Sequence, residues 1–227
     1  TSNDFPKAEP AGKKSGFVDK PALQMSGRLS SVRPCQIIQF ELDSAALREI
    51  SKRKGGSVTA YILALMFIAH KYSTDEPEGP INIQVPVNMR KFYKSATLRN
   101  FSMYCGIRLK LSDISDPEEN IPSIVKQLNE KASRESMNEM MNATVGLVRA
   151  LRYVPLFIKQ PAASLVYGFL GDRLFSNTFS NIGIVNLPTE MEDNIDRFEA
   201  VLGPSSINRA SCAMISFGGK TVLSVTK

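Results

Sequence analysis

The sequence predicts an α/β domain of the α+β kind, in which a mixed sheet is flanked by helices. Strand-like segments occur both before and after a helical block in the middle of the chain. This order favours a layered sheet over a helical bundle or an all-β barrel. The composition, with 43% hydrophobic and 22% charged residues, is typical of a globular protein. A chain of 227 residues is long enough to bury a substantial core.

The first 34 residues have the composition of a linker. They contain four prolines together with several glycines, lysines and serines, and they sustain no apolar period. We therefore expect residues 1–34 to form a linker or wrapping arm and residues 35–227 to form the folded domain.

Regular elements begin immediately after this segment. Alternating apolar residues predict a strand over 37–43, which ends at a good helix N-cap, Asp43. A short helix over 44–54 follows, and two glycines end it. Ser57 then caps a helix over 57–72 that is apolar on nearly every side, so we expect this helix to be buried.

Alternation between apolar and polar residues predicts a strand over 81–87, and Pro86 marks either its end or a sheet edge. A further strand over 103–111 precedes a helix of about twenty residues that opens at Pro117. The remaining elements are helices over 145–158 and 162–170, and strands at about 177–182, 197–202, 208–217 and 220–226.

Charge and cysteine content exclude several classes of function. The net charge of +6 is spread over many segments, so we expect no nucleic-acid partner, although an anionic small molecule such as a coenzyme A thioester would suit it. Cys35, Cys105 and Cys212 lie far apart with no accompanying histidine. They predict reduced thiols and neither a disulfide framework nor a metal site.

The longest apolar run, over 58–69, is shorter than the roughly 18 to 20 residues that span a bilayer, and no signal peptide opens the chain. We expect no membrane span and a cytoplasmic location. Because the chain starts at Thr1 and stops at Lys227, directly after a strand-like run, we also expect a fragment or a trimmed chain. The strand at that end could pair with a missing lobe or with another copy.

The single histidine, His70, is the obvious candidate for a general base. It lies near the end of the apolar helix, where the dipole favours a cation and solvent is close, so we expect a surface or packing histidine. Asp75 follows beyond the helix and does not share a helical face with it. The chain has no Gly-x-Ser-x-Gly elbow, and Gly218-Gly219 predicts a hairpin turn because Met214 replaces the first glycine of a phosphate loop.

Two segments that follow strands are better candidates for a site. Asn88 and Arg90 come after the strand at 81–87, where an arginine could bind a carboxylate or phosphate, or form an ion pair that stabilises the loop. Ser180, Asn181 and Gly183 follow another strand. The glycine either serves a turn or permits close approach of the backbone to a ligand.

Three parts of the chain together resemble motifs of one protein superfamily. They are Val85-Pro-Val-Asn-Met-Arg90 followed by Leu98-Arg-Asn-Phe101, Thr178-Phe-Ser-Asn-Ile-Gly183 running into Leu187-Pro188, and the Val-Thr of the helix over 57–72. The ordered set, over about residues 35–227, is similar to the carboxy-terminal lobe of the chloramphenicol-acetyltransferase-like and condensation-domain proteins. Alcohol-acetyltransferase-like members are nearest. The resemblance implies one lobe of a two-lobe fold with a tunnel between the lobes.

In that superfamily a His-His-x-x-x-Asp-Gly motif of the other lobe supplies the general base. No residue of this chain matches that motif, so no catalytic residue is carried over and the resemblance implies a missing amino-terminal lobe. Ser180, Asn181 and Gly183 would line the tunnel or support an oxyanion, and Asn88 and Arg90 would support the site or contact coenzyme A.

The implied function is the carboxy-terminal lobe of an acyl-CoA-dependent acyltransferase, with O-acetyl transfer to a small alcohol, or transfer to an amine acceptor. This chain alone would then be inactive. Three alternatives stay open, namely a noncatalytic binding or assembly module, condensation-like transfer from a carrier protein, and a standalone enzyme that uses His70.

Overall fold

A computed structural model describes residues 21–27, 35–155, 157–160, 172–203 and 209–227. Most of the expected linker and the helix expected over 162–170 lie outside these residues. The strands are β1 (Ile37–Asp43), β2 (Pro80–Asn88), β3 (Ser102–Lys110), β4 (Asn177–Ile184), β5 (Ser211–Phe217) and β6 (Lys220–Thr226). The main helices are α1 (Ser44–Arg53), α2 (Val58–Lys71), α3 (Pro117–Lys131), α4 (Arg134–Ala150) and the short α6 (Thr189–Glu192).

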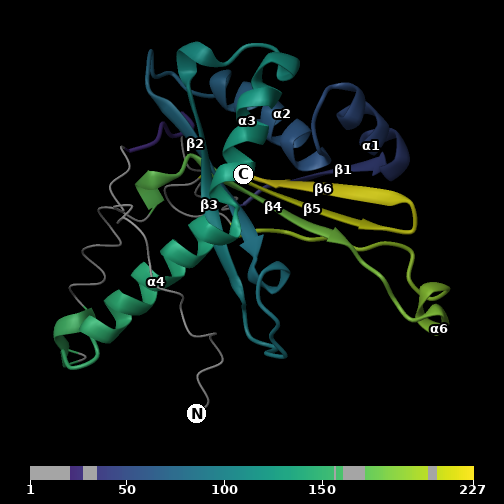
Figure 1. Cartoon of the computed structure of the whole chain (residues 1–227). Coiled ribbons are helices and arrows are strands. Elements are labelled where there is room, and N and C mark those ends of the chain that lie inside the picture. The colour runs from purple at the N-terminus through teal and green to yellow at the C-terminus, as the bar shows by residue number, and fades with distance from the viewer. Residues whose placement is uncertain (1–20, 28–34, 156, 161–171, 204–208) are drawn as a thin grey trace.

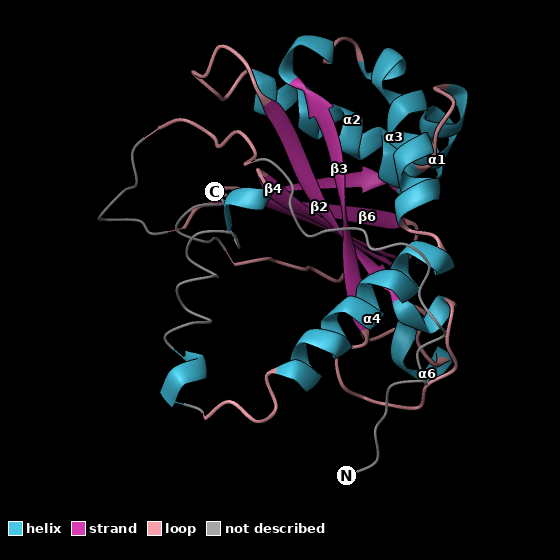
Figure 2. Cartoon of the chain, turned by 60° about the vertical axis from the view of Figure 1, so that its left-hand side comes forward, coloured by secondary structure: helices cyan, strands magenta, loops and turns pink. Residues whose placement is uncertain are grey.

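The strands form one mixed sheet in the order β1-β6-β5-β4-β2-β3. Strand β4 lies parallel to both of its neighbours, β2 and β5, whereas the other pairs are antiparallel. Helices α1, α2 and α3 gather on one side of the sheet, and α4 leads away from them (Figures 1 and 2). The predicted mixed sheet flanked by helices is therefore confirmed.

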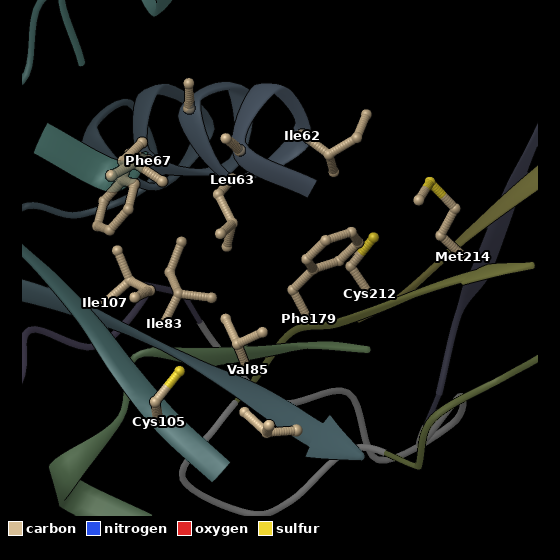
Figure 3. Close-up of a cluster of buried hydrophobic side chains, with 14 of the residues drawn as sticks. Ile62, Leu63, Phe67, Ile83, Val85, Cys105, Ile107, Phe179, Cys212 and Met214 are labelled. Carbon is tan, nitrogen blue, oxygen red and sulfur yellow. The ribbon is translucent and has the colours of Figure 1, made fainter. Parts of the chain in front are cut away.

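The core lies between α2 and the sheet. Leu63 and Phe67 of α2 are fully buried and point towards side chains of the sheet such as Ile83, Ile107 and Phe179 (Figure 3). Burial of such side chains is the main favourable term in folding, at roughly 1.5–3 kcal/mol for each large apolar group. It explains why a helix as apolar as α2 forms the centre of the domain, as its sequence predicts.

Local signals place most element boundaries correctly. The side chain of Asp43 accepts a hydrogen bond from the Ala46 amide at the start of α1, and Ser57 does the same for Ala60 in α2. Gly218 and Gly219 form the hairpin turn between β5 and β6 with φ angles of 56° and 81°, which favour glycine.

Several predicted elements differ from the structure. The helix that opens at Pro117 ends at Lys131, and α4 starts at Arg134, well before the helix expected from residue 145. No strand occurs over 197–202, where one was predicted. There, Phe198 packs edge-on against Phe217 at 5.1 Å between ring centroids, so this segment covers the sheet instead of joining it.

Two expectations about strand edges can be compared with the structure. Strand β2 continues through Pro86 to Asn88, so this proline does not end the strand. It lies where β2 is paired with β3 alone, which is locally an edge position, as the second alternative predicted. Strand β6, near the end of the chain, lies between β1 and β5 and presents no edge. The two edges of the sheet are β1 and β3.

Candidate functional site

The two motifs lie at the carboxyl ends of neighbouring parallel strands, β2 and β4. These strands pair only through Ile83 with Asn177 and Gln84 with Thr178. Just there, the Thr178 hydroxyl donates to the Gln84 side-chain oxygen at 3.0 Å. Beyond this point the pairing stops, and β2 and β4 run apart (Figure 1). In open α/β sheets, ligands bind at such carboxyl ends. We call this region, which comprises residues 85–90 at the end of β2 and residues 178–183 of β4, the carboxyl edge.

The end of β4 contains a β-bulge built by the side chain of Asn181. The register with β5 shifts between Asn181 and Gly183, and Gly183 has a φ of 92° that a side chain would strain. The Asn181 side-chain oxygen accepts from the Gly183 amide at 2.9 Å, and its Nδ2 donates to the Thr59 hydroxyl at 3.0 Å. The side chain of Asn181 therefore links the bulge to the first turn of α2 by hydrogen bonds.

Adjacent residues of this motif point to opposite sides of the sheet. Side chains alternate along a strand, so Asn181 shares the face of the buried Phe179, towards α2, and Ser180 lies on the other face. Within the described part of the chain, no hydrogen-bond partner is found for the Ser180 hydroxyl. The side chain of Asn181 is thus occupied in holding the bulge, whereas that of Ser180 can interact with a ligand.

The end of β2 is held by Asn88 and Arg90. The Asn88 side chain accepts from the Arg90 amide at 3.0 Å and caps a short 3₁₀ turn. The Arg90 guanidinium donates to the carbonyls of Thr97 and Arg99 at 2.8 and 3.0 Å. It also lies 5.8 Å from the centre of the Phe101 ring. These contacts fold the loop back on itself through carbonyls, where the sequence had suggested an ion pair or a ligand.

This loop also carries a positive surface. Lys91, Lys94 and Arg99 are exposed, and no ion pair to them is found among the residues the structure describes. No acidic residue occurs between Glu78 and Asp113. The potential beside the carboxyl edge is therefore positive.

His70 lies far from this region and is a packing residue. Its side chain is 1% exposed, and its Nδ1 lies 3.5 Å from the Asn177 amide at the amino end of β4. Burial lowers the pKa of His70 to about 4, and the nearby Leu23 backbone opposes this only partly. Of the two expected positions, surface or packing, the structure shows the packing one, because the imidazole faces the sheet.

The two buried thiols are equally unsuited to catalysis. Burial raises the pKa of Cys105 to about 11 and that of Cys212 to about 12. The described residues contain no cluster of three or more histidine, cysteine or acidic side chains that could hold a metal ion. No helix in the described ranges is long and apolar enough to cross a membrane.

Solved structures with the same arrangement of elements are found at low sequence identity. The trichothecene 15-O-acetyltransferase of Fusarium sporotrichioides superposes with a TM-score of 0.61 at 11% identity, over 91% of this chain and 44% of that one. This chain has the fold of one lobe of a chloramphenicol-acetyltransferase-like protein. The resemblance expected from the motifs is thereby confirmed at the level of the fold.

Two further structures support the same assignment. The epimerization domain from the third module of tyrocidine synthetase B gives a TM-score of 0.52 at 12% identity, over 92% of this chain and 45% of that one. The nonribosomal peptide synthetase FmoA3 superposes with a TM-score of 0.55 at 12% identity, over 91% of this chain and 20% of that one. The chain thus spans less than half the length of each. No family model matches the sequence, and no curated protein matches it either.

Sequence reasoning missed two residues of the carboxyl edge. Thr59 was noticed only as part of the Val-Thr motif, and its role as the partner of Asn181 depends on a contact between residues 122 positions apart. The bond between Thr178 and Gln84 likewise requires knowledge of which strands are neighbours. The feature of the sequence that could have indicated these contacts was the presence of polar residues at the ends of two strands.

Proposed function

We propose that this chain is the carboxy-terminal lobe of an enzyme that transfers an acyl group to an alcohol or amine. The observation that carries the proposal is the match to one lobe, over 91% of this chain but only 44% of an acetyltransferase. The general base would come from an amino-terminal lobe that faces the carboxyl edge. His70, buried and neutral, is not available for that role.

In the proposed reaction the base takes the proton of the acceptor, whose oxygen or nitrogen attacks the acyl carbonyl. The carbonyl oxygen becomes an oxyanion, and the thiolate of the donor leaves when the carbonyl re-forms. Ser180 is the group of this lobe that we propose as a donor to the oxyanion, because its hydroxyl has no partner among the described residues. Asn181 and Gly183 would position it through the bulge.

For the donor we propose an acyl-CoA. Lys91, Lys94 and Arg99 give the loop after β2 a positive charge that would suit the phosphates of coenzyme A. Asn88 and Arg90 would contribute indirectly, since their side chains hold this loop in place. The acceptor would be a small alcohol or amine.

The test begins with the coding sequence upstream of Thr1, which should encode a His-x-x-x-Asp segment. Acetyl-CoA consumption is then measured with a panel of alcohols and amines, for this chain alone and for the protein that includes the upstream lobe. We expect turnover only from the longer protein. Absence of such a segment, or equal turnover after its histidine is replaced by alanine, would reject the mechanism.

A serine substitution tests the contribution of this lobe. Ser180→Ala in the two-lobe protein should lower kcat by roughly 10²-fold, which is the usual effect of losing one oxyanion donor, without changing the unfolding midpoint. The matched control is Ser123→Ala, an exposed serine on α3. Equal kcat values for the two variants would remove Ser180 from the proposal.

A condensation-type reaction is the second candidate. It is favoured by the similarity to domains of nonribosomal peptide synthetases. In that case the acyl group would arrive on the phosphopantetheine of a carrier protein. Turnover with an acyl carrier protein but not with acyl-CoA would establish this alternative. A folded two-lobe protein that transfers from neither donor would instead be a noncatalytic binding or assembly module.

A further inference from the structure

The two edges of the sheet are treated differently by the rest of the chain. At the β3 edge, the side chain of Gln127 accepts from the Arg108 amide at 3.0 Å and donates to the Arg108 carbonyl at 2.8 Å. Lys131 donates to the Gly106 carbonyl at 2.7 Å. Side chains of α3 therefore occupy three of the backbone groups through which β3 could pair with another strand, namely both groups of Arg108 and the carbonyl of Gly106.

At the β1 edge, the free backbone groups can be identified from the pairing with β6. Gln36 and Lys227 exchange both backbone hydrogen bonds, at 2.7 and 2.8 Å. In an antiparallel ladder such pairs recur at every second residue, so the even-numbered residues of β1 face β6. The amides and carbonyls of Ile37, Gln39 and Glu41 point outwards, and no hydrogen bond to them is found from any described residue.

The side chains of β1 are also unusually exposed for an edge strand. Ile37 is 50% exposed, Ile38 41% and Phe40 49%. Residues 35–43 contain no lysine and no proline, the residues that commonly protect an open edge. An apolar edge with free backbone groups is a template for strand addition.

We propose that β1 pairs antiparallel with β1 of a second copy of this chain, about a two-fold axis at Phe40. The strand Ile-Ile-Gln-Phe-Glu-Leu-Asp is self-complementary in this register. Phe40 lies opposite itself, Ile38 opposite Leu42 and Gln39 opposite Glu41. Ile38, Phe40 and Leu42 of the two copies meet on one face of the extended sheet. The other face carries the Gln39–Glu41 pairs, with Ile37 opposite Asp43 at each end of the contact.

The backbone geometry agrees with this register. The residues whose amides and carbonyls point outwards, Gln39 and Glu41, become the hydrogen-bonded pairs across the axis. Phe40, whose backbone groups are used by β6, falls at a non-hydrogen-bonded position, where opposed Cα atoms approach to about 4.5 Å. A register shifted by one residue would not satisfy both conditions.

Charge does not oppose the pairing. Glu41 lies opposite Gln39 of the second copy, so like charges are not directly opposed. The carboxylate of Glu41 is 3.2 Å from Lys220 and 3.8 Å from Arg197 of its own chain. Gln39 also donates to the carboxylate of Glu199 at 2.9 Å, and Arg197 pairs with that carboxylate. Each acidic group beside the axis therefore has a basic partner in its own chain.

Mass measurement by sedimentation equilibrium tests the proposal, over about a hundredfold range of concentration that reaches high micromolar. We expect the mass to approach twice that of one chain and to fall twofold in Phe40→Lys, which places like charges at the axis. The control is Leu98→Lys, at a fully exposed leucine far along the chain, and it should remain dimeric. Unfolding midpoints of both variants confirm that they fold.

A cross-link provides a second readout. Phe40→Cys, in a Cys35→Ser background, should form a disulfide between two copies under mild oxidation, because opposed residues at the axis meet the distance requirement. The same background with Leu98→Cys should not. A one-chain mass throughout the range, a dimer that persists in Phe40→Lys, or equal cross-linking at positions 40 and 98 would each overturn the proposal.

Discussion

The buried state of His70 predicts a pH-dependent stability that can be measured without a competing histidine. It is the only histidine of the chain. Its pKa is about 4 in the folded protein, against a usual value of 6.5 that applies when the chain unfolds. Between these values the unfolded chain binds a proton that the folded chain does not. Stability is therefore complete above pH 6.5 and is lost as the pH falls.

The magnitude follows from the two pKa values. Each unit of pKa difference corresponds to about 1.4 kcal/mol, so the full effect is about 3 kcal/mol once the pH is below 4. Between about pH 7.5 and pH 5 the loss should be about 2 kcal/mol.

Urea unfolding of the native sequence and of His70→Gln, at a series of pH values, measures the contribution of His70 to the free energy of unfolding. Glutamine is neutral throughout, so the difference between the two unfolding free energies should fall by about 2 kcal/mol from pH 7.5 to pH 5. The imidazole proton resonance of the folded protein should not titrate above about pH 5. Parallel stability curves, or a resonance that titrates near pH 6.5, would refute the assigned burial of the ring.

The remaining predictions concern the carboxyl edge and the closed edge of the sheet. A double-mutant cycle of Thr59→Val and Asn181→Ala should give a coupling free energy of about 1 kcal/mol in urea unfolding, with Thr59→Ser as the control that keeps the hydroxyl. Additive effects would contradict the bond. Arg90→Lys should speed proteolysis of the loop after β2 by about tenfold at nearly unchanged overall stability, because a lysine cannot bind two carbonyls in a fixed fork. An unchanged cleavage rate would contradict this anchor. Gln127→Leu should accelerate hydrogen exchange at the Arg108 amide and increase aggregation on heating, and unaltered exchange there would show that the edge is protected by other means.

The sequence pattern predicted correctly those elements in which buried residues recur at a regular spacing. In β2, the alternation of Ile81, Ile83, Val85 and Val87 corresponds to buried positions along the whole strand, and no distant contact was needed to interpret it. The start of α2 could also be predicted from the sequence, because the Ser57 side chain accepts a hydrogen bond from a backbone amide within the same turn.

Prediction failed where distant contacts decide the conformation. The segment over 197–202 has a strand-like mixture of apolar and polar residues. In the structure Arg197 pairs with Glu199 and reaches Glu41 of β1, while Phe198 packs on Phe217. Side-chain contacts with the sheet replace the backbone ladder, and nothing in the local pattern indicates this choice.

The sequence places the residues of the candidate site at the ends of two strands, but it does not give their geometry. The sequence indicates polar residues after two strands, and alternation along β4 could have separated Ser180 from Asn181. The link from Asn181 to Thr59 could not be foreseen, because it depends on how α2 crosses the sheet. For His70 the sequence left a surface and a packing position open, and the choice between them again depends on how that end of α2 faces the sheet.

The contacts from α3 to β3 also decide how far a sheet built from this chain can grow. A chain with two open edges can add copies without limit and form a fibre. Here Gln127 and Lys131 occupy outward backbone groups of Arg108 and Gly106 on the β3 side of the sheet, whereas those of β1 stay open among the described residues. These bonds oppose strand addition at β3, so pairing through β1 favours two copies over a fibre.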